Sequence, residues 1–153
     1  MRSGPFARMR QARADERELG TGLWRRDHDR FARAMDRCWQ VLQEAEARSQ
    51  LAAEEINGVV HACNVLAEAL PEVRALCVRL QAQFPAGEDH RIPPAASETH
   101  RELSRASHEL AATAQAIAMF RLRQAGTDAV GRHAERTLAH VRRAHEVAPV
   151  RTG

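Results

Sequence analysis

The sequence predicts an all-α protein, folded as an antiparallel bundle of three or four long helices with coiled-coil-like packing. Large apolar residues recur every three or four positions from Trp24 to Phe84, and steps of this size return to the same face of a helix. No segment alternates apolar and polar residues as a strand would. Only 4% of the 153 residues are aromatic, so the core must consist of small and aliphatic side chains, and these let helices approach closely.

Residues 1–22 are predicted to form an Arg-rich arm that is either flexible or a frayed helix, because few large apolar groups interrupt its polar residues. Gly20 and Gly22 end this segment. Thr21 is expected to cap a helix that begins near Trp24, since a threonine oxygen can accept hydrogen bonds from the first free backbone N–H groups.

The first helix of the stripe is expected to reach about Arg48, and the connection that follows has three interpretations. Ser49 caps a second helix, Asn57-Gly58 makes a later turn, or a single helix continues through the whole stripe, because no Gly or Pro lies between Trp24 and Asn57. Pro71 is expected to kink the second part of the stripe without ending it.

A linker is predicted over residues 85–94, which hold three of the six prolines. Thr99 and Glu102 have the spacing of a capping box just after the linker, either at the start of the next helix or one turn inside an earlier start. Gly126 is expected to end that helix, and Thr127-Asp128 to start the last one, which runs to about Val147. The chain therefore divides into the arm, a single bundle domain over 23–148 and a tail over 149–153.

The apolar stripe, called the seam below, is interpreted as a core or a self-association surface. If residues 24–84 form one long helix, a monomer leaves much of the seam in water, and the alanine-rich later helices offer little area to cover it. This reasoning favours a homodimer. The seam positions are Phe31, Met35, Leu42, Ile56, Val59, Cys63, Leu66, Leu70, Val73 and Leu80.

Cysteine placement and hydropathy indicate a cytoplasmic protein. The three cysteines, Cys38, Cys63 and Cys77, fall on the apolar stripe, which favours buried, reduced thiols. No apolar stretch follows the basic N-terminus as it would in a secretory signal. No run approaches the roughly 20 apolar residues of a membrane span.

Charge is unevenly distributed, which suggests a macromolecular partner. The net charge is +4 over residues 1–37, −5 over 38–100 and +4 over 101–153. The basic outer segments can lie against the acidic middle either within one bundle or across a dimer. All 23 basic residues are arginine, so chemistry that requires a lysine, such as a Schiff base or a Walker A phosphate loop, is excluded.

Arg26, Arg30, Arg33 and Arg37 recur at four, three and four residues and therefore share one helical face. As a solvated face they form ordinary ion pairs, for example between Asp29 and Arg33. As a functional face they contact a protein partner or grip phosphates of a nucleic acid. Nucleic-acid recognition normally adds stacking aromatics or a helix-turn-helix pattern, and neither is present.

No catalytic, cofactor-binding or metal-ligating residue is predicted. None of the eight histidines has a carboxylate or second histidine three or four residues away, the spacing by which helical bundles bind metal. The glutamate pairs 68/72 and 98/102 match acidic surface positions. His28 lies on the apolar stripe and is expected to be partly buried and hydrogen-bonded, whereas His61 and His108 are expected on the surface.

These patterns lead to a hypothesis of a non-enzymatic interaction or regulatory protein that dimerises through the seam and binds a protein partner through charged faces. The first alternative is a nucleic-acid-associated accessory protein that uses the four arginines. The second alternative, a metal-binding or enzymatic bundle assembled across helices, has least support from the residues.

Overall fold

The computed structural model describes residues 4–48, 50–89 and 91–150 and shows an all-α protein; over these ranges no residue is in a strand. This confirms the predicted all-α class, while the coiled-coil-like packing stays a prediction. Four long helices follow a shorter first one, and a single 3-10 turn, η1, precedes α4. The elements are α1 (Pro5–Leu19), α2 (Leu23–Glu46), α3 (Ala53–Gln83), η1 (Pro94–Ala96), α4 (Ser97–Arg121) and α5 (Asp128–Val147).

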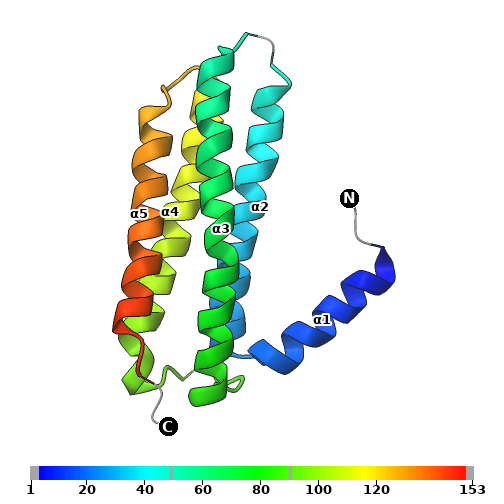
Figure 1. Ribbon diagram of the computed structural model, residues 1–153, viewed down its shortest axis with the longest axis vertical. Helices are drawn as coiled ribbons and strands as arrows, with labels where there is room; N and C mark the ends of the chain where they lie inside the picture. Colours follow the sequence, from blue (N-terminus) through cyan, green and yellow to red (C-terminus); the bar gives the residue numbers. More distant parts are fainter. Residues whose placement is uncertain (1–3, 49, 90, 151–153) are drawn as a thin grey trace.

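Helices α2 to α5 pack side by side as a four-helix bundle (Figure 1). The chain rises in α2, descends in α3, crosses the foot of the bundle, rises again in α4 and descends in α5. Helices that follow each other after a turn are therefore antiparallel, as predicted. Helix α2 also packs against α4, and these two neighbours are parallel because the connection over residues 84–96 crosses at the foot.

The chain turns between Glu46 and Ala53, so the structure selects the hairpin from the three interpretations and excludes one long helix through the seam. The predicted Ser49 cap lies outside the described residues, and Asn57-Gly58 lies within α3. Pro71 also lies inside α3, which continues past it for three further turns. The predicted passage of the helix through this proline is confirmed.

The seam forms the core of the bundle. Every seam position is buried except Ile56 and Leu70, which are partly exposed and pack against the core from its edge. Trp24 is fully buried at the foot, where its indole N–H donates to the carbonyl of Phe84 at 2.9 Å. Because helices of the same chain cover the seam, its burial requires no second chain, and the predicted dimer would need another surface.

Two predicted helix caps are wrong. Helix α2 begins one residue later than Thr21 requires, with Gly22 at the N-cap position, because the backbone there lies against the carbonyls of Ala86 and Gly87. Thr99 lies in the first turn of α4, which begins at Ser97 as the earlier-start alternative allows, but no capping box forms. The Thr99 hydroxyl is buried without a hydrogen-bond partner in the described residues.

Of the two boundaries between α4 and α5, one agrees with its prediction and the other does not. Thr127 is the N-cap residue of α5, as predicted. Helix α4 ends at Arg121, before the predicted Gly126. Arg123 adopts the positive φ of 60° in this connection, a conformation more common in glycine.

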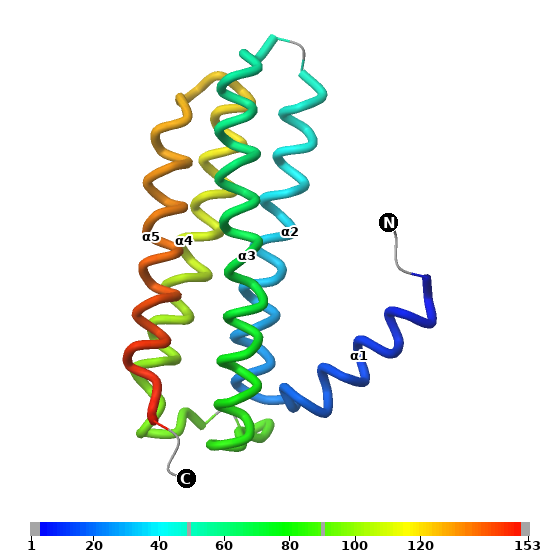
Figure 2. The backbone as a smooth tube through the Cα atoms, in the orientation of Figure 1, coloured from blue at the N-terminus to red at the C-terminus, as the bar shows by residue number. Residues whose placement is uncertain are grey.

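Helix α1 accounts for most of the predicted arm and projects from the foot of the bundle (Figure 1). Its last residue, Leu19, is fully buried in the core. Arg74 of α3 holds the same end, donating to Asp15 at 2.5 Å and to Glu18 at 2.8 Å. From this attachment the helix diverges from α2 and α3, as the backbone trace in Figure 2 shows. Among the described helices none is long and apolar enough to cross a membrane.

Candidate functional site

The four predicted arginines lie on the outer face of α2. Arg30, Arg33 and Arg37 are exposed, and Arg26 is partly exposed. The row begins in the first turn of α2, and its first and last members are eleven positions apart, which corresponds to about 16 Å along the helix axis. The sequence prediction that these four side chains project opposite the seam is confirmed.

In the part of the chain that the structure describes, none of the four arginines forms an ion pair with a carboxylate. The predicted pair between Asp29 and Arg33 is wrong. Asp29 instead accepts from Arg25 at 2.9 Å and contacts the His28 ring at 2.9 Å. By the rotation of 100° per residue, Asp29 lies on the α3 side of the row, so it does not pair with these arginines.

Helix α4 contributes a second basic row that the sequence interpretation missed. Arg101, Arg105 and His108 are exposed and recur at four and three residues, so they share one face of α4. The same spacing that revealed the α2 row was present here. The sequence could not show that α4 lies beside α2.

Three contacts fix the register of the two parallel helices, and each joins α2 to α4. The Asp27 carboxylate meets the His100 ring at 2.7 Å near the foot. The Cys38 thiol donates to the carbonyl of Leu110 at 3.6 Å in the middle. Glu44 and Arg121 form an ion pair near the top of the bundle.

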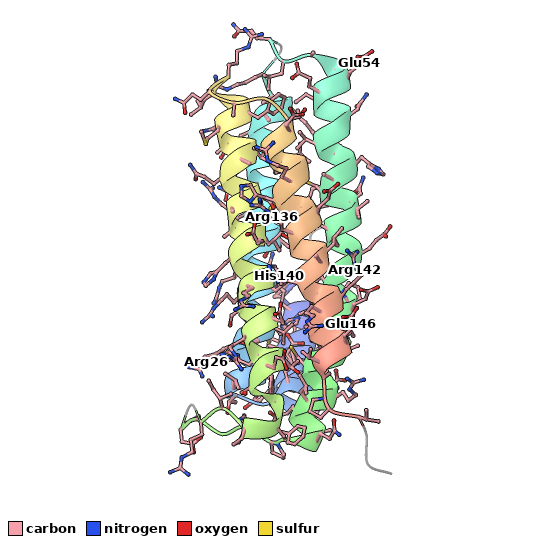
Figure 3. The ribbon with its side chains drawn as sticks, turned by 90° about the vertical axis from the view of Figure 1, so that its left-hand side faces the viewer. Arg26, Glu54, Arg136, His140, Arg142 and Glu146 are labelled. Carbon is pink, nitrogen blue, oxygen red and sulfur yellow. The ribbon has the colours of Figure 1, made fainter. Side chains whose placement is uncertain are left out.

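This register places the two basic rows level with each other on one side of the bundle. We call this surface the basic face, comprising Arg26, Arg30, Arg33 and Arg37 of α2 with Arg101, Arg105 and His108 of α4. In Figure 3 the Arg26 side chain projects outward at its lower end. Met119 and Leu122, which are 37% and 46% exposed, continue the α4 row toward the top. The surface is therefore basic in its lower part and apolar at its upper end.

The electrostatics of the helices reinforce the positive potential of this face. Helices α2 and α4 both begin at the foot, so the partial positive charges of their N-termini lie at the same end as the arginines. The first turn of α2 contains no acidic residue. Arg26 in this first turn is unfavourable with respect to the helix dipole by about 0.3–1 kcal/mol.

A buried carboxylate lies beneath the basic face. Asp27 is 3% exposed, and burial raises the pKa of Asp27, while the hydrogen bond and charge of His100 and the charges of Arg30 and Arg26 oppose that rise. The His100 ring thus fills the space between α2 and α4 and partly neutralises Asp27. This pair holds the two helices of the basic face in register.

Two further histidine–carboxylate pairs join α4 to α5. Glu102 is 6% exposed, so its predicted surface position is wrong. Its carboxylate contacts the His140 ring at 2.7 Å and accepts from Arg105 at 3.0 Å, which is why Glu102 does not form the predicted capping box. The Glu109 carboxylate contacts the His133 ring at 2.8 Å. These pairs were not predicted, because the partners are far apart in sequence.

Three histidines and three cysteines lie where the sequence predicts them. His28 is 8% exposed and bonded to Asp29, as predicted, and His61 and His108 are exposed. Within the described ranges no three His, Cys, Asp or Glu residues are grouped to hold a metal ion. The three cysteines are buried, and burial raises the pKa of the Cys38 thiol to about 12 and that of Cys63 to about 11. Such thiols are poor nucleophiles at neutral pH.

No family model, curated protein or solved structure matches this chain.

Proposed function

We propose that this protein is a non-enzymatic interaction module that binds an acidic surface of a protein partner through the basic face. The observation that carries this proposal is the row of four α2 arginines without ion pairs in the described chain, level with a second basic row on α4. Exposed arginines are normally accompanied by acidic neighbours on a solvated helix. Their concentration here favours recognition of negative charge.

The composition of the face favours a protein partner over a nucleic acid. Protein interfaces are enriched in arginine and methionine, and Met119 extends the basic face at its upper end. No exposed aromatic side chain accompanies the arginines on α2 or α4 to stack on a base. Backbone phosphates of duplex DNA remain the alternative ligand, because guanidinium groups bind phosphate and carboxylate alike.

Binding to two acidic polymers tests the proposal and separates these ligands. We expect the protein to bind poly-glutamate at low salt, and to bind it more tightly than generic duplex DNA of matched charge. Changing Arg26, Arg30, Arg33 and Arg37 together to Gln should weaken binding by roughly a hundredfold, since each lost charge contact contributes up to about 1 kcal/mol.

The matched control changes four exposed arginines of α5, Arg132, Arg136, Arg142 and Arg143, to Gln. This variant has the same net charge as the first one and should retain most of the binding. Equal losses in the two variants would show a nonspecific effect of net charge and overturn the proposal. Tighter, face-dependent binding to DNA would replace it with the nucleic-acid function.

A further inference from the structure

A cavity of about 320 Å³ opens at the top of the bundle, at the end opposite the foot. The connection from α2 to α3 and the connection from α4 to α5 both lie at this end (Figure 1). Leu51 of the first connection and Ala125 of the second line the cavity, together with Phe120 in the last turn of α4. Its volume is at the lower end of the range of about 300–1,000 Å³ that is typical of small-molecule pockets. The size of the cavity therefore suits a small ligand.

A carboxylate and a guanidinium line this cavity without pairing with each other. Glu55 and Arg123 both belong to its wall, and among the described residues neither of them forms an ion pair. Gln124 adds an amide that can donate or accept a hydrogen bond. Opposite charges that line one cavity and stay apart leave room for a ligand that pairs with both.

The position of Glu55 on α3 directs its side chain over the upper end of the core. Val59 and Leu66, four and eleven residues further along α3, are both buried, and steps of this size return to the same face of a helix. Glu55 lies in the first turn of α3, one turn above Val59. It therefore continues a row of core positions, with a carboxylate where the bundle ends.

Arg123 is held on the opposite side of the cavity by its backbone and by one hydrogen bond. Its φ of 60° is uncommon for a residue other than glycine, and residues in such conformations are concentrated at ligand-binding sites. The Nη2 group donates to the carbonyl of Gln50 at 3.1 Å, which joins the two connections. A guanidinium has five N–H donors, so further donors of Arg123 can bind a ligand while this bond is kept.

From these features we propose that the cavity binds a small zwitterion, namely a free α-amino acid with an aliphatic side chain. The ammonium group of the ligand pairs with Glu55, and its carboxylate pairs with Arg123 in the planar geometry by which guanidinium groups bind carboxylates. The aliphatic side chain contacts Leu51 and Ala125. Neither Glu55 nor Arg123 belongs to the basic face, so this site is independent of the function proposed above.

Three compounds of similar shape test the charge requirement by NMR titration of the full chain. L-leucine carries both charges, isocaproate only the carboxylate and isoamylamine only the ammonium group. We expect L-leucine to bind with a millimolar dissociation constant and to shift amide resonances of residues 51–55 and 120–126, which include the cavity wall. Isocaproate and isoamylamine should each bind roughly fivefold more weakly, because each lacks one charge contact.

Two variants assign each charge of the ligand to its residue. Glu55→Gln should weaken the binding of L-leucine and isoamylamine roughly fivefold and leave that of isocaproate unchanged. Arg123→Gln should weaken the binding of L-leucine and isocaproate by a similar factor and leave that of isoamylamine unchanged. Because Arg123 also holds Gln50, the Glu55 variant, which breaks no ion pair of the described chain, provides the decisive result.

The matched controls are Glu135→Gln and Arg136→Gln, which remove the same charges from exposed positions of α5 outside this cavity. Both should bind L-leucine as the wild type does. No shift of the cavity resonances by millimolar L-leucine, equal affinities for the three compounds, or equal losses in the controls would each overturn the proposal. Binding to poly-glutamate through the basic face would be unaffected by any of these results.

Discussion

Helix α3 and helix α1 lie next to each other at the foot of the molecule but are stabilised in opposite ways. Helix α3 packs against α2 and α5 along its length and supplies eight buried residues to the core. Helix α1 supplies one, Leu19, and is otherwise held by ion pairs at its C-terminal end. The comparison shows that this chain separates a self-sufficient core from a segment whose stability depends on other contacts.

Truncating a core residue should give the largest effect and should distinguish the two helices most clearly. Leu66 of α3 is fully buried, so Leu66→Ala should lower the free energy of unfolding by about 2–5 kcal/mol. Phe6→Ala, at an exposed position of α1, should change it by less than about 0.5 kcal/mol. Urea denaturation at high dilution measures both. A small loss at Leu66 would mean that the core is not packed as described.

Removing the partner of Asp27 should have the next largest effect and should depend on pH. His100→Leu leaves a buried carboxylate without its hydrogen bond, at a cost of about 2–3 kcal/mol near neutral pH. Burial already raises the pKa of Asp27 in the folded state above its value in the unfolded chain. Between these two pKa values the folded state binds the proton more strongly, so the free energy of unfolding falls as pH rises. The loss should therefore be larger at about pH 7 than at about pH 4.

The control for this variant is a second substitution, Asp27→Asn, made in the His100→Leu chain. An amide at position 27 does not titrate in this range, so the additional pH dependence should disappear. Its persistence would assign the effect to another group. Thermal unfolding at a series of pH values measures both chains.

A methyl group at Gly22 should have an intermediate effect. A Cβ there would lie 2.3 Å from the carbonyl oxygen of Ala86 and 2.5 Å from that of Gly87, so the connection at the foot must shift. We expect Gly22→Ala to cost roughly 1–3 kcal/mol. Gly131→Ala in α5 meets nothing within 4 Å and should gain up to about 1 kcal/mol from helix propensity. Opposite signs in thermal denaturation would verify the close approach.

The smallest effect on global stability should come from the attachment of α1. Arg74→Ala removes two partly exposed ion pairs and should change the free energy of unfolding by less than about 1 kcal/mol. Amide hydrogen exchange near Asp15 and Glu18 should nevertheless become faster, with no change in α4. Unchanged exchange in α1 would show that Leu19 alone is sufficient to hold it.

The helix-forming pattern could be predicted from the sequence because local spacing determines it. The seam, the linker and the start of α5 at Thr127 all follow from residues within a few positions of each other. The pairing of α2 with α4 could not be predicted in this way. It depends on where the linker crosses, and the contact between Gly22 and the linker carbonyls that helps fix this crossing has no local signature.

For the same reason, the sequence predicted the α2 half of the basic face and not the α4 half. The α2 arginines share one helix and one spacing, so their common face was evident. Arg101 and Arg105 have similar spacing, but their relevance depends on the neighbouring helix. The contact between Asp27 and His100 spans 73 residues, and only the position of Asp27 beside Phe31 on the stripe hinted that this carboxylate is buried.

The crossing of the linker at the foot also makes the two ends of the basic face chemically different. If α2 and α4 were antiparallel neighbours, their arginines would lie at opposite ends of the surface, and a ligand could bind in either orientation. Because both helices start at the same end, positive charge gathers below and Met119 with Leu122 lies above. If the proposed partner matches both ends, it can bind in one orientation only, and the route of a short connecting segment would then set the polarity of the proposed complex.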